Sequence, residues 1–195
     1  MGVELTGGPP DIVVDFSAAW ARVLPDDDLA DWARSAAEQA WALSGARPSA
    51  LDEERLAAEF TILARVAFQS PCFGAFVFCP APSQGVRACV RLIGLRYPPG
   101  TEGGTIVDEF LLPAERQLLE PQVEQSTDAG LRRIRIRQRA WSADTGRVSD
   151  HVAYVFPGDD GAWALTTSLP DPREAELLLA DLDELAAGVQ LYPGG

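Results

Sequence analysis

The sequence predicts an α+β fold: a two-layer sandwich in which an antiparallel sheet of about five strands carries helices on one face. Residues 131–141 alternate between arginine and mostly apolar side chains, which is typical of one strand in a sheet that is covered on one face only. Two more strand-like segments follow after short turns, and strands joined in this way pair antiparallel. An amphipathic helical pattern over 172–188 closes the chain and predicts a helix that covers the sheet.

The length of 195 residues favours one domain, because single cores are commonly built at about 100 to 200 residues. Within the domain 1–195 we expect a possible arm over 1–25 and an N-terminal helical pair over 26–70. The sheet and its C-terminal helix are expected over 71–191. Residues 12–14 in the arm are apolar and could form a short strand.

Two helices are predicted near the N-terminus. Apolar residues recur every three or four positions over 26–44, and the aspartates at the start of this segment complement the helix dipole. Gly45 is a natural end for that helix. The second helix is predicted over 52–68, because acidic residues occupy its first turn and Pro71 prevents its continuation.

Five segments have the composition of strands. Residues 73–79 and 86–97 form a predicted hairpin, since a loop with proline, serine and glycine joins them. Residues 105–112 are ambiguous between strand and helix, whereas Pro113 suits the first turn of a short helix that ends before Pro121. The remaining three strands form a predicted meander over 131–141, 148–156 and 162–169.

The C-terminal helix has the clearest signals. Asp171 is its predicted N-cap, Pro172 occupies the first helical position, and Glu174 completes an Asp-x-x-Glu box. An apolar stripe follows at helical spacing. It consists of Ala175, Leu178, Leu179, Leu182, Leu185, Ala186 and Val189.

The order of these elements resembles the Mog1/PsbP-like α/β sandwich proteins, including actinobacterial members. The segments most similar to that fold are the end of the meander, Trp163-Ala164-Leu165-Thr166-Thr167-Ser168, and the helix over 172–188. The resemblance covers roughly 73–191 and implies a partner-binding or accessory role, with no functional residue carried over. The competing fold is an NTF2-like cone, which usually ends on a strand, so the C-terminal helix weighs against it.

The formal net charge of −13 repels polyanions, which argues against general binding to nucleic acid or to anionic membranes. All 16 basic residues are arginine, and the chain has neither lysine nor asparagine, a composition typical of a high-GC bacterial genome. A Schiff-base lysine and a P-loop lysine are therefore excluded. No apolar run approaches the roughly 20 residues that a membrane helix needs, and no secretory signal is visible. We expect a cytoplasmic protein.

Candidate catalytic residues are few. His151 is the single histidine, and Asp150 beside it points to the opposite face of a regular strand, so the two cannot form a dyad. Cys72, Cys79 and Cys89 lack the close pairs of a zinc site and are interpreted as reduced thiols in or near the core. We therefore predict no catalytic residue, no metal and no cofactor, and enzymatic activity is the less favoured interpretation.

The strongest candidate site is the arginine stripe, which we define as Arg133, Arg135, Arg137 and Arg139. Strand alternation places all four guanidinium groups on one face, where we expect them to be exposed to solvent and to bind an acidic protein segment. A solubility role is the plain alternative. The neighbouring strand supplies only Asp150 as an internal partner. Other internal partners could be Glu115, Glu120 or Glu124.

The leading hypothesis is thus a non-enzymatic protein-binding or accessory module that recognises an acidic partner through its arginine-lined face. One alternative is a small-molecule-binding protein or enzyme with a pocket between the sheet and the N-terminal helices. A second alternative is a structural homo-oligomer in which acidic helix starts meet the arginine face of a neighbour. The aromatic residues that could wall the pocket are Trp32, Trp41, Phe60 and Trp163.

Overall fold

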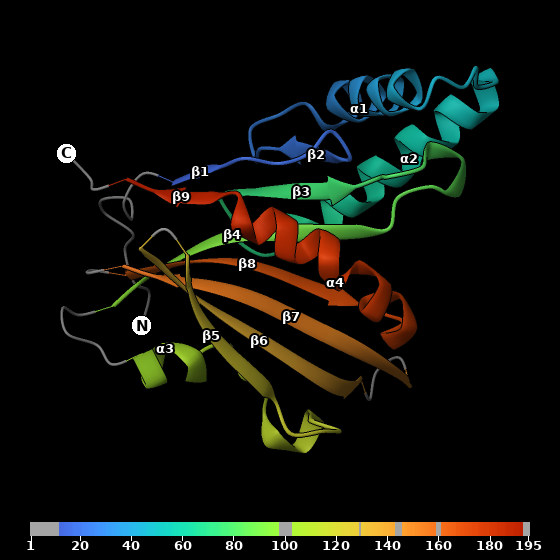
Figure 1. Ribbon diagram of the computed structural model, residues 1–195. Coiled ribbons are helices and arrows are strands. Elements are labelled where there is room, and N and C mark those ends of the chain that lie inside the picture. The colour runs from blue at the N-terminus through green and yellow to red at the C-terminus, as the bar shows by residue number, and fades with distance from the viewer. Residues whose placement is uncertain (1–11, 98–102, 129, 143–145, 159–160, 193–195) are drawn as a thin grey trace. The chain divides into compact units, whose positions relative to one another are not determined.

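The structure is a computed structural model in which two compact units are formed. We call 16–93 the helical unit, and the described residues up to Asp15 and from Gly94 onward the sheet unit. Figure 1 labels their helices and strands. The single domain predicted over 1–195 stays a prediction. The described residues are 12–97, 103–128, 130–142, 146–158 and 161–192.

The first predicted helix is confirmed as α1 (Leu29–Ser44). Its N-cap is Asp28, whose side chain accepts hydrogen bonds from the backbone N–H groups of Ala30 and Asp31. The helix ends at Gly45, which has a φ of 69°, in the left-handed region that glycine adopts without strain. The aspartates at this helix start therefore have a capping role, as the dipole argument requires.

The second helix, α2 (Ala50–Ala67), begins two residues before the predicted position. Ser49 and Asp52 form a capping box there, since each side chain accepts from the backbone N–H of the other residue. The apolar sides of α1 and α2 pack together against the strands of the helical unit. Their shared core contains Ala33, Ala36, Ala37, Trp41, Leu56, Phe60, Val77 and Cys79.

The helical unit contains an antiparallel set of strands in the order β2-β3-β4. The predicted hairpin is confirmed by β3 (Gly74–Phe78) and β4 (Ala88–Arg96), with a short 3-10 helix, η1 (Pro82–Gln84), in its loop. β2 (Trp20–Val23) pairs with β3 and was not expected. The unit boundary falls within β4, whose last residues, from Gly94, belong to the sheet unit.

The sheet unit contains four strands in the order β8-β7-β6-β5, and each pair is antiparallel. The predicted meander is confirmed by β6 (Leu131–Ser142), β7 (Arg147–Pro157) and β8 (Gly161–Leu169). β5 (Gln122–Asp128) was not expected; it pairs with β6 and all seven of its residues are exposed. The large antiparallel sheet therefore has seven strands, rather than about five, and β2 and β5 are the two additions.

The C-terminal helix is confirmed as α4 (Pro172–Ala187), and it packs on β7 and β8. Asp171 caps it by accepting from the N–H of Arg173. The predicted apolar stripe faces the protein, with Ala175, Leu178, Leu182, Leu185 and Ala186 buried. After the helix, β9 (Val189–Leu191) pairs antiparallel with β1 (Ile12–Val14), so the apolar segment 12–14 does form a strand.

The prediction that helices lie on one face of the sheet only is wrong for the sheet unit. In the sheet unit, α4 covers the face of β6 and β7 that carries Arg135 and Tyr154. The opposite face of β6 carries Gln138, which bonds to the segment after α3 (Gly103–Asp108): its amide nitrogen donates to the carbonyl of Phe110. Figure 1 shows α3 and α4 on opposite sides of these strands.

The region between α3 and β5 also differs from the prediction. The ambiguous segment 105–112 is helical at its start, and the short helix expected after Pro113 is a single 3-10 turn, η2 (Ala114–Arg116). The buried amide of Gln138 explains the irregular backbone between them, because it satisfies a backbone N–H and a backbone C=O there.

Among the described residues, the helices are too short or too polar for any of them to cross a lipid bilayer.

Candidate functional site

The arginine stripe lies along β6, as the alternation predicted. Its neighbours on β7 are fixed by the strand register, which places Arg135 opposite Tyr154, Arg137 opposite Val152 and Arg139 opposite Asp150. Side chains opposite each other on antiparallel strands lie on the same face. The face is not open, however, because α4 packs over β7 and β8 beside the stripe.

Asp150 is the centre of the stripe's ion pairs and is fully buried. Arg137 donates to Asp150 Oδ2 through Nε at 3.0 Å and Nη2 at 2.6 Å. Arg139 donates from Nε to Oδ1 at 2.7 Å and from Nη2 to Oδ2 at 3.1 Å. Burial raises the pKa of the Asp150 carboxyl, but the hydrogen bonds from Arg139 and Arg137 outweigh it, so the pKa lies below its usual value.

The acidic residues of α4 supply two further partners. Glu176 accepts from Arg137 at 2.7 Å, while Asp183 accepts two hydrogen bonds from Nη1 of Arg135 at 3.0 and 2.8 Å. Tyr154 donates to the same carboxylate at 2.9 Å. These bonds join the helix to the sheet by directional contacts, in addition to the apolar stripe below it.

The edge strand β5 supplies one more carboxylate to the arginine stripe. Glu124 accepts from Nη2 of Arg135 at 2.7 Å, so Arg135 holds one carboxylate from β5 and another, Asp183, from α4. Burial lowers the pKa of Arg135, but the hydrogen bond with Glu124 and the charge of Asp183 outweigh it and raise that pKa. Arg135 therefore remains a cation at every physiological pH.

The expectation that the arginine stripe is exposed to solvent is met only in part, because all four residues are half-buried. The side chains of Arg135, Arg137 and Arg139 are 26%, 15% and 31% exposed and contact carboxylates of the same unit. The physical reason is the position of α4, which covers this face and brings acidic residues to it. The carboxylates that contact these three arginines are Glu124, Asp150, Glu176 and Asp183.

Arg133 differs from the rest of the stripe. In the described part of the chain it makes no ion pair, and its recorded hydrogen bond is a long one, 3.4 Å from Nε to the hydroxyl of Ser126. Its two terminal nitrogens therefore remain available to a ligand as far as the described residues are concerned. The role in partner binding predicted for the four stripe residues stays a prediction.

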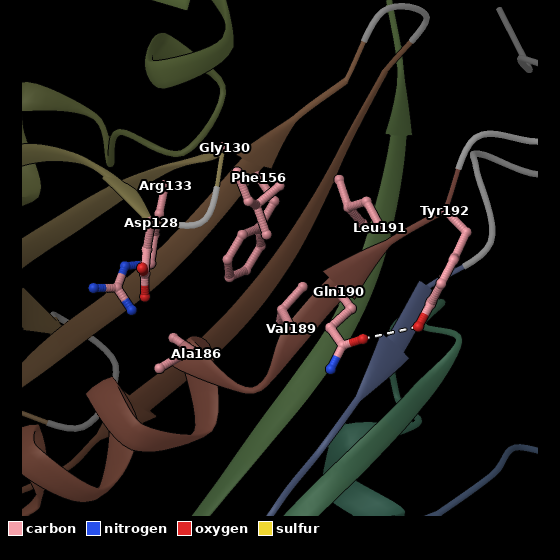
Figure 2. A pocket seen from close by; sticks show the side chains of 11 residues that line it. Asp128, Gly130, Arg133, Phe156, Ala186, Val189, Gln190, Leu191 and Tyr192 are labelled. Atoms are coloured by element: carbon pink, nitrogen blue, oxygen red, sulfur yellow. Dashed lines mark hydrogen bonds between the residues drawn. The ribbon is translucent and has the colours of Figure 1, made fainter.

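A pocket of about 560 Å³ begins at Arg133. It lies within the sheet unit, between the β5–β6 hairpin, the end of α4 and β9. In Figure 2, Asp128 and Arg133 lie at one end of the pocket, Phe156 lies in the middle, and Tyr192 lies at the other end. The lining residues are Asp128, Gly130, Leu131, Arg133, Phe156, Ala186, Ala187, Val189, Gln190, Leu191 and Tyr192.

Polar and apolar atoms contribute about equally to the walls of this pocket, and charged or amide side chains lie at its two ends. Gln190 is already engaged, since its amide nitrogen donates to Asp15 at 2.8 Å and its carbonyl oxygen accepts from the Tyr192 hydroxyl at 2.8 Å. Asp128 and Arg133 have no such mutual bond, although they lie on adjacent strands. An apolar pocket with a few polar groups is the usual form of a small-molecule site.

The aromatic residues proposed as pocket walls have another role. Trp41 and Phe60 are buried in the helical unit, and Trp32 packs edge-on against Phe60 with ring centroids 5.6 Å apart. Trp163 is also buried, in the sheet unit. None of them lines the pocket described above.

His151 does not form a catalytic dyad with Asp150, which confirms the argument from strand alternation. Its Nε2 lies 3.0 Å from the hydroxyl of Ser149, a neighbour on the same face. The pKa of His151 is lowered by burial and by the charge of Arg116. Among the described side chains, no carboxylate forms a hydrogen bond with the imidazole of His151. Ser149 and His151 therefore lack the acidic group that orients the base in a catalytic triad.

The three cysteines are not in disulfides, as expected; Cys79 is buried, and Cys72 and Cys89 are half-buried. Burial raises the pKa of Cys79 to about 11 and that of Cys89 to about 12, so neither is a thiolate at neutral pH. The arginine beside Cys89, Arg91, lowers that pKa less than burial raises it. Within the described ranges, histidine, cysteine and acidic side chains do not gather into a group that could hold a metal ion.

Sequence reasoning missed the partners that α4 supplies. Glu176 and Asp183 are seven residues apart, about two helical turns, so they project from the same flank of the helix. That spacing is visible in the sequence, but it does not say which face of the sheet the helix covers. The pocket has no sequence signal, because its lining comes from segments that only the fold brings together.

Comparisons with known proteins give similarity to solved structures alone. No protein-family model and no curated protein sequence matches the chain. LpqN of Mycobacterium tuberculosis, described as involved in cell envelope biogenesis, is similar with a TM-score of 0.48 and 11% identity, over 97% of this chain and 88% of LpqN. The cyanobacterial PsbP (CyanoP) of Synechocystis sp. PCC 6803 is similar with a TM-score of 0.45 and 10% identity, over 98% of both chains.

A PsbP-like protein is thus among the similar structures, in line with the resemblance found in the sequence.

Proposed function

We propose that this protein binds a small amphipathic molecule in the pocket beside Arg133, and that it does so without catalysing a reaction. The observation that carries the proposal is an arginine with no described ion-pair partner at the end of a pocket that also has apolar walls. Buried or half-buried charges are normally paired, and an unpaired one beside a cavity favours an external partner.

The size and position of the pocket support this function. A volume of about 560 Å³ falls within the range of roughly 300 to 1,000 Å³ that small-molecule sites occupy. Phe156 and Val189 are buried residues of the surrounding elements, so they offer fixed apolar walls. The described lining has one carboxylate, Asp128, and neither histidine nor cysteine beside it, which favours binding over catalysis.

A fluorescent probe tests the proposal. The uncharged apolar dye N-phenyl-1-naphthylamine should bind the protein at one saturable site with enhanced emission. The variant Ala187→Trp should abolish this site, because Ala187 is an exposed pocket residue near the end of α4 and a tryptophan there would fill the cavity. The matched control is Ala180→Trp, seven residues earlier on the same helix, which lies outside the pocket lining and should bind the dye normally.

Thermal unfolding of both variants should stay cooperative, which excludes binding of the dye to loosened structure. Equal dye binding by wild type and Ala187→Trp would contradict the proposal.

Recognition of an acidic protein segment by the arginine stripe remains a second prediction. The internal carboxylates weaken it, since an acidic segment would have to displace Glu124, Glu176 or Asp183 to reach most of the stripe. A synthetic peptide of ten glutamates, titrated at low and moderate salt, tests it. Binding that disappears in Arg133→Glu would favour this function, and absence of binding at low salt would exclude it.

We expect a cytoplasmic bacterial protein without a nucleic-acid or membrane partner, and the homo-oligomer with acidic helix starts against the arginine face stays a prediction. Sedimentation at two protein concentrations checks the oligomer.

A further inference from the structure

The pocket contains both signs of charge at the same end. Arg133 lies opposite Ser126 in the β5–β6 register, so Asp128 is its diagonal neighbour on the same face of the sheet. Such neighbours have Cα atoms about 7 to 8 Å apart, within reach of a long side chain. Even so, the two side chains make no ion pair with each other. The charged side chains of the pocket lining therefore sum to zero.

The charge of the whole chain adds a second constraint. A net charge of −13 disfavours a purely anionic ligand, because the field of the protein repels it before it reaches Arg133. A purely cationic ligand would be attracted at long range but would meet the guanidinium group in the pocket. A ligand with no net charge and both signs avoids both penalties.

Building on the proposed function, we propose that the ligand has a zwitterionic head group, a carboxylate bound by Arg133 and an ammonium group bound by Asp128, on an apolar chain. The Nε of Arg133 is directed to Ser126, which leaves the Nη1 and Nη2 groups to donate two parallel bonds to a carboxylate. The apolar chain then lies along Phe156, Val189 and Leu191. The ligand class is an aliphatic amino acid or a similar small amphipathic zwitterion.

Four ligands with the same eight-carbon chain test this inference by calorimetry: 2-aminooctanoate, octanoate, octylamine and octan-1-ol. Wild type should bind 2-aminooctanoate at least about tenfold more tightly than the other three, since only this ligand satisfies both charges. Arg133→Gln should lose about tenfold in affinity for it, and Asp128→Asn a similar factor. The matched control is Arg132→Gln, at the preceding residue of β6, whose side chain lies on the opposite face and donates a hydrogen bond to Gln125. This control should bind as wild type does.

The outcomes separate the two proposals. Equal affinity for all four ligands would overturn the zwitterionic head group while leaving a general apolar binding pocket. Tighter binding of octanoate than of 2-aminooctanoate would also overturn it, in favour of a simple anion site. Absence of binding by every one of the four, octan-1-ol included, would overturn the binding function together with the head group.

Discussion

The two ends of the arginine stripe differ in their partners, although the same residue type repeats along the strand. Arg135, Arg137 and Arg139, the paired end, hold carboxylates from β5, β7 and α4. Arg133, the open end, projects from the same face of the same strand and makes no ion pair with a described residue. The difference comes from α4, whose acidic residues 176 and 183 lie near the paired end.

This contrast teaches that strand alternation determines the face on which a side chain lies, whereas the next layer determines its function. At the paired end the guanidinium groups are structural, because they hold the helix on the sheet and satisfy a buried carboxylate. At the open end the same group faces a pocket and can bind a ligand. The predictions below test this division, beginning with the largest effect.

Removing the buried carboxylate should have the largest effect on stability. Asp150→Ala leaves Arg137 and Arg139 partly buried without their main partner, and breaking a buried ion pair costs about 3 to 5 kcal/mol. Urea unfolding measures this loss. The same substitution at the open end, Asp128→Ala, is the control and should change the free energy of unfolding by less than about 0.5 kcal/mol. Similar losses for the two variants would show that the ends do not differ.

Acid should weaken the paired end by a smaller amount. The pKa of Asp150 in the folded protein lies below its usual value of 3.8, so its charged form stabilises the fold. This contribution is complete above the unfolded-state pKa and is lost as the pH falls through the lower, folded-state pKa. The protonated carboxyl still fills its site, so the loss is smaller than that of Asp150→Ala. The difference between the urea unfolding midpoints of wild type and Asp150→Ala should therefore become smaller as the pH falls below about 3.8. A difference that stays constant over this range would contradict this account.

The contact between α4 and the sheet should be worth less than the buried pair. Asp183 is 39% exposed, so Asp183→Asn should cost about 1 kcal/mol through weaker bonds to Arg135 and Tyr154. Asp181→Asn, on the same helix, is the control and should cost almost nothing. If thermal unfolding gives equal midpoints for the two variants, the ion pair at Asp183 does not help to hold the helix.

The smallest effect on stability should come from the open end. Arg133→Gln should change the free energy of unfolding by less than about 0.5 kcal/mol, because the described structure gives Arg133 one long hydrogen bond and no ion pair. Arg137→Gln, at the paired end, should cost more because it removes a donor from Asp150. Chemical denaturation of the two variants measures the free energy of unfolding that each loses. A larger loss for Arg133→Gln than for Arg137→Gln would contradict the structural role assigned to the paired end.

The sequence alone was enough to predict the elements that bury an apolar face. α4 shows a clear period because Leu178, Leu182 and Leu185 face the protein. β6 alternates between buried and half-buried residues, and most residues of β7 and β8 are buried, so all three have strand composition. β5 was not predicted, because its seven residues are exposed and show no apolar alternation. β2 is a four-residue strand, too short to show a period.

The candidate site was predicted only in part. The face of the arginine stripe followed from alternation, but its partners depend on which side of the sheet α4 covers, a tertiary choice that no local pattern encodes. One signal was available: Gln138 interrupts the apolar face of β6 and is buried. A buried amide needs hydrogen-bond partners, so it indicates that another chain segment crosses that face.

The short ribbon of β1 and β9 has a consequence for how this chain folds. Ile12 pairs with Leu191, and the bond from Gln190 to Asp15 spans 175 positions. Closing so long a loop is slow relative to local contacts and has a large entropic cost. Because Val189, Gln190 and Leu191 also line the pocket, the binding site becomes complete only at this late step. During synthesis the pocket therefore cannot form before residues 189–192 have been translated, and a ligand that occupies it would select chains that have completed this step.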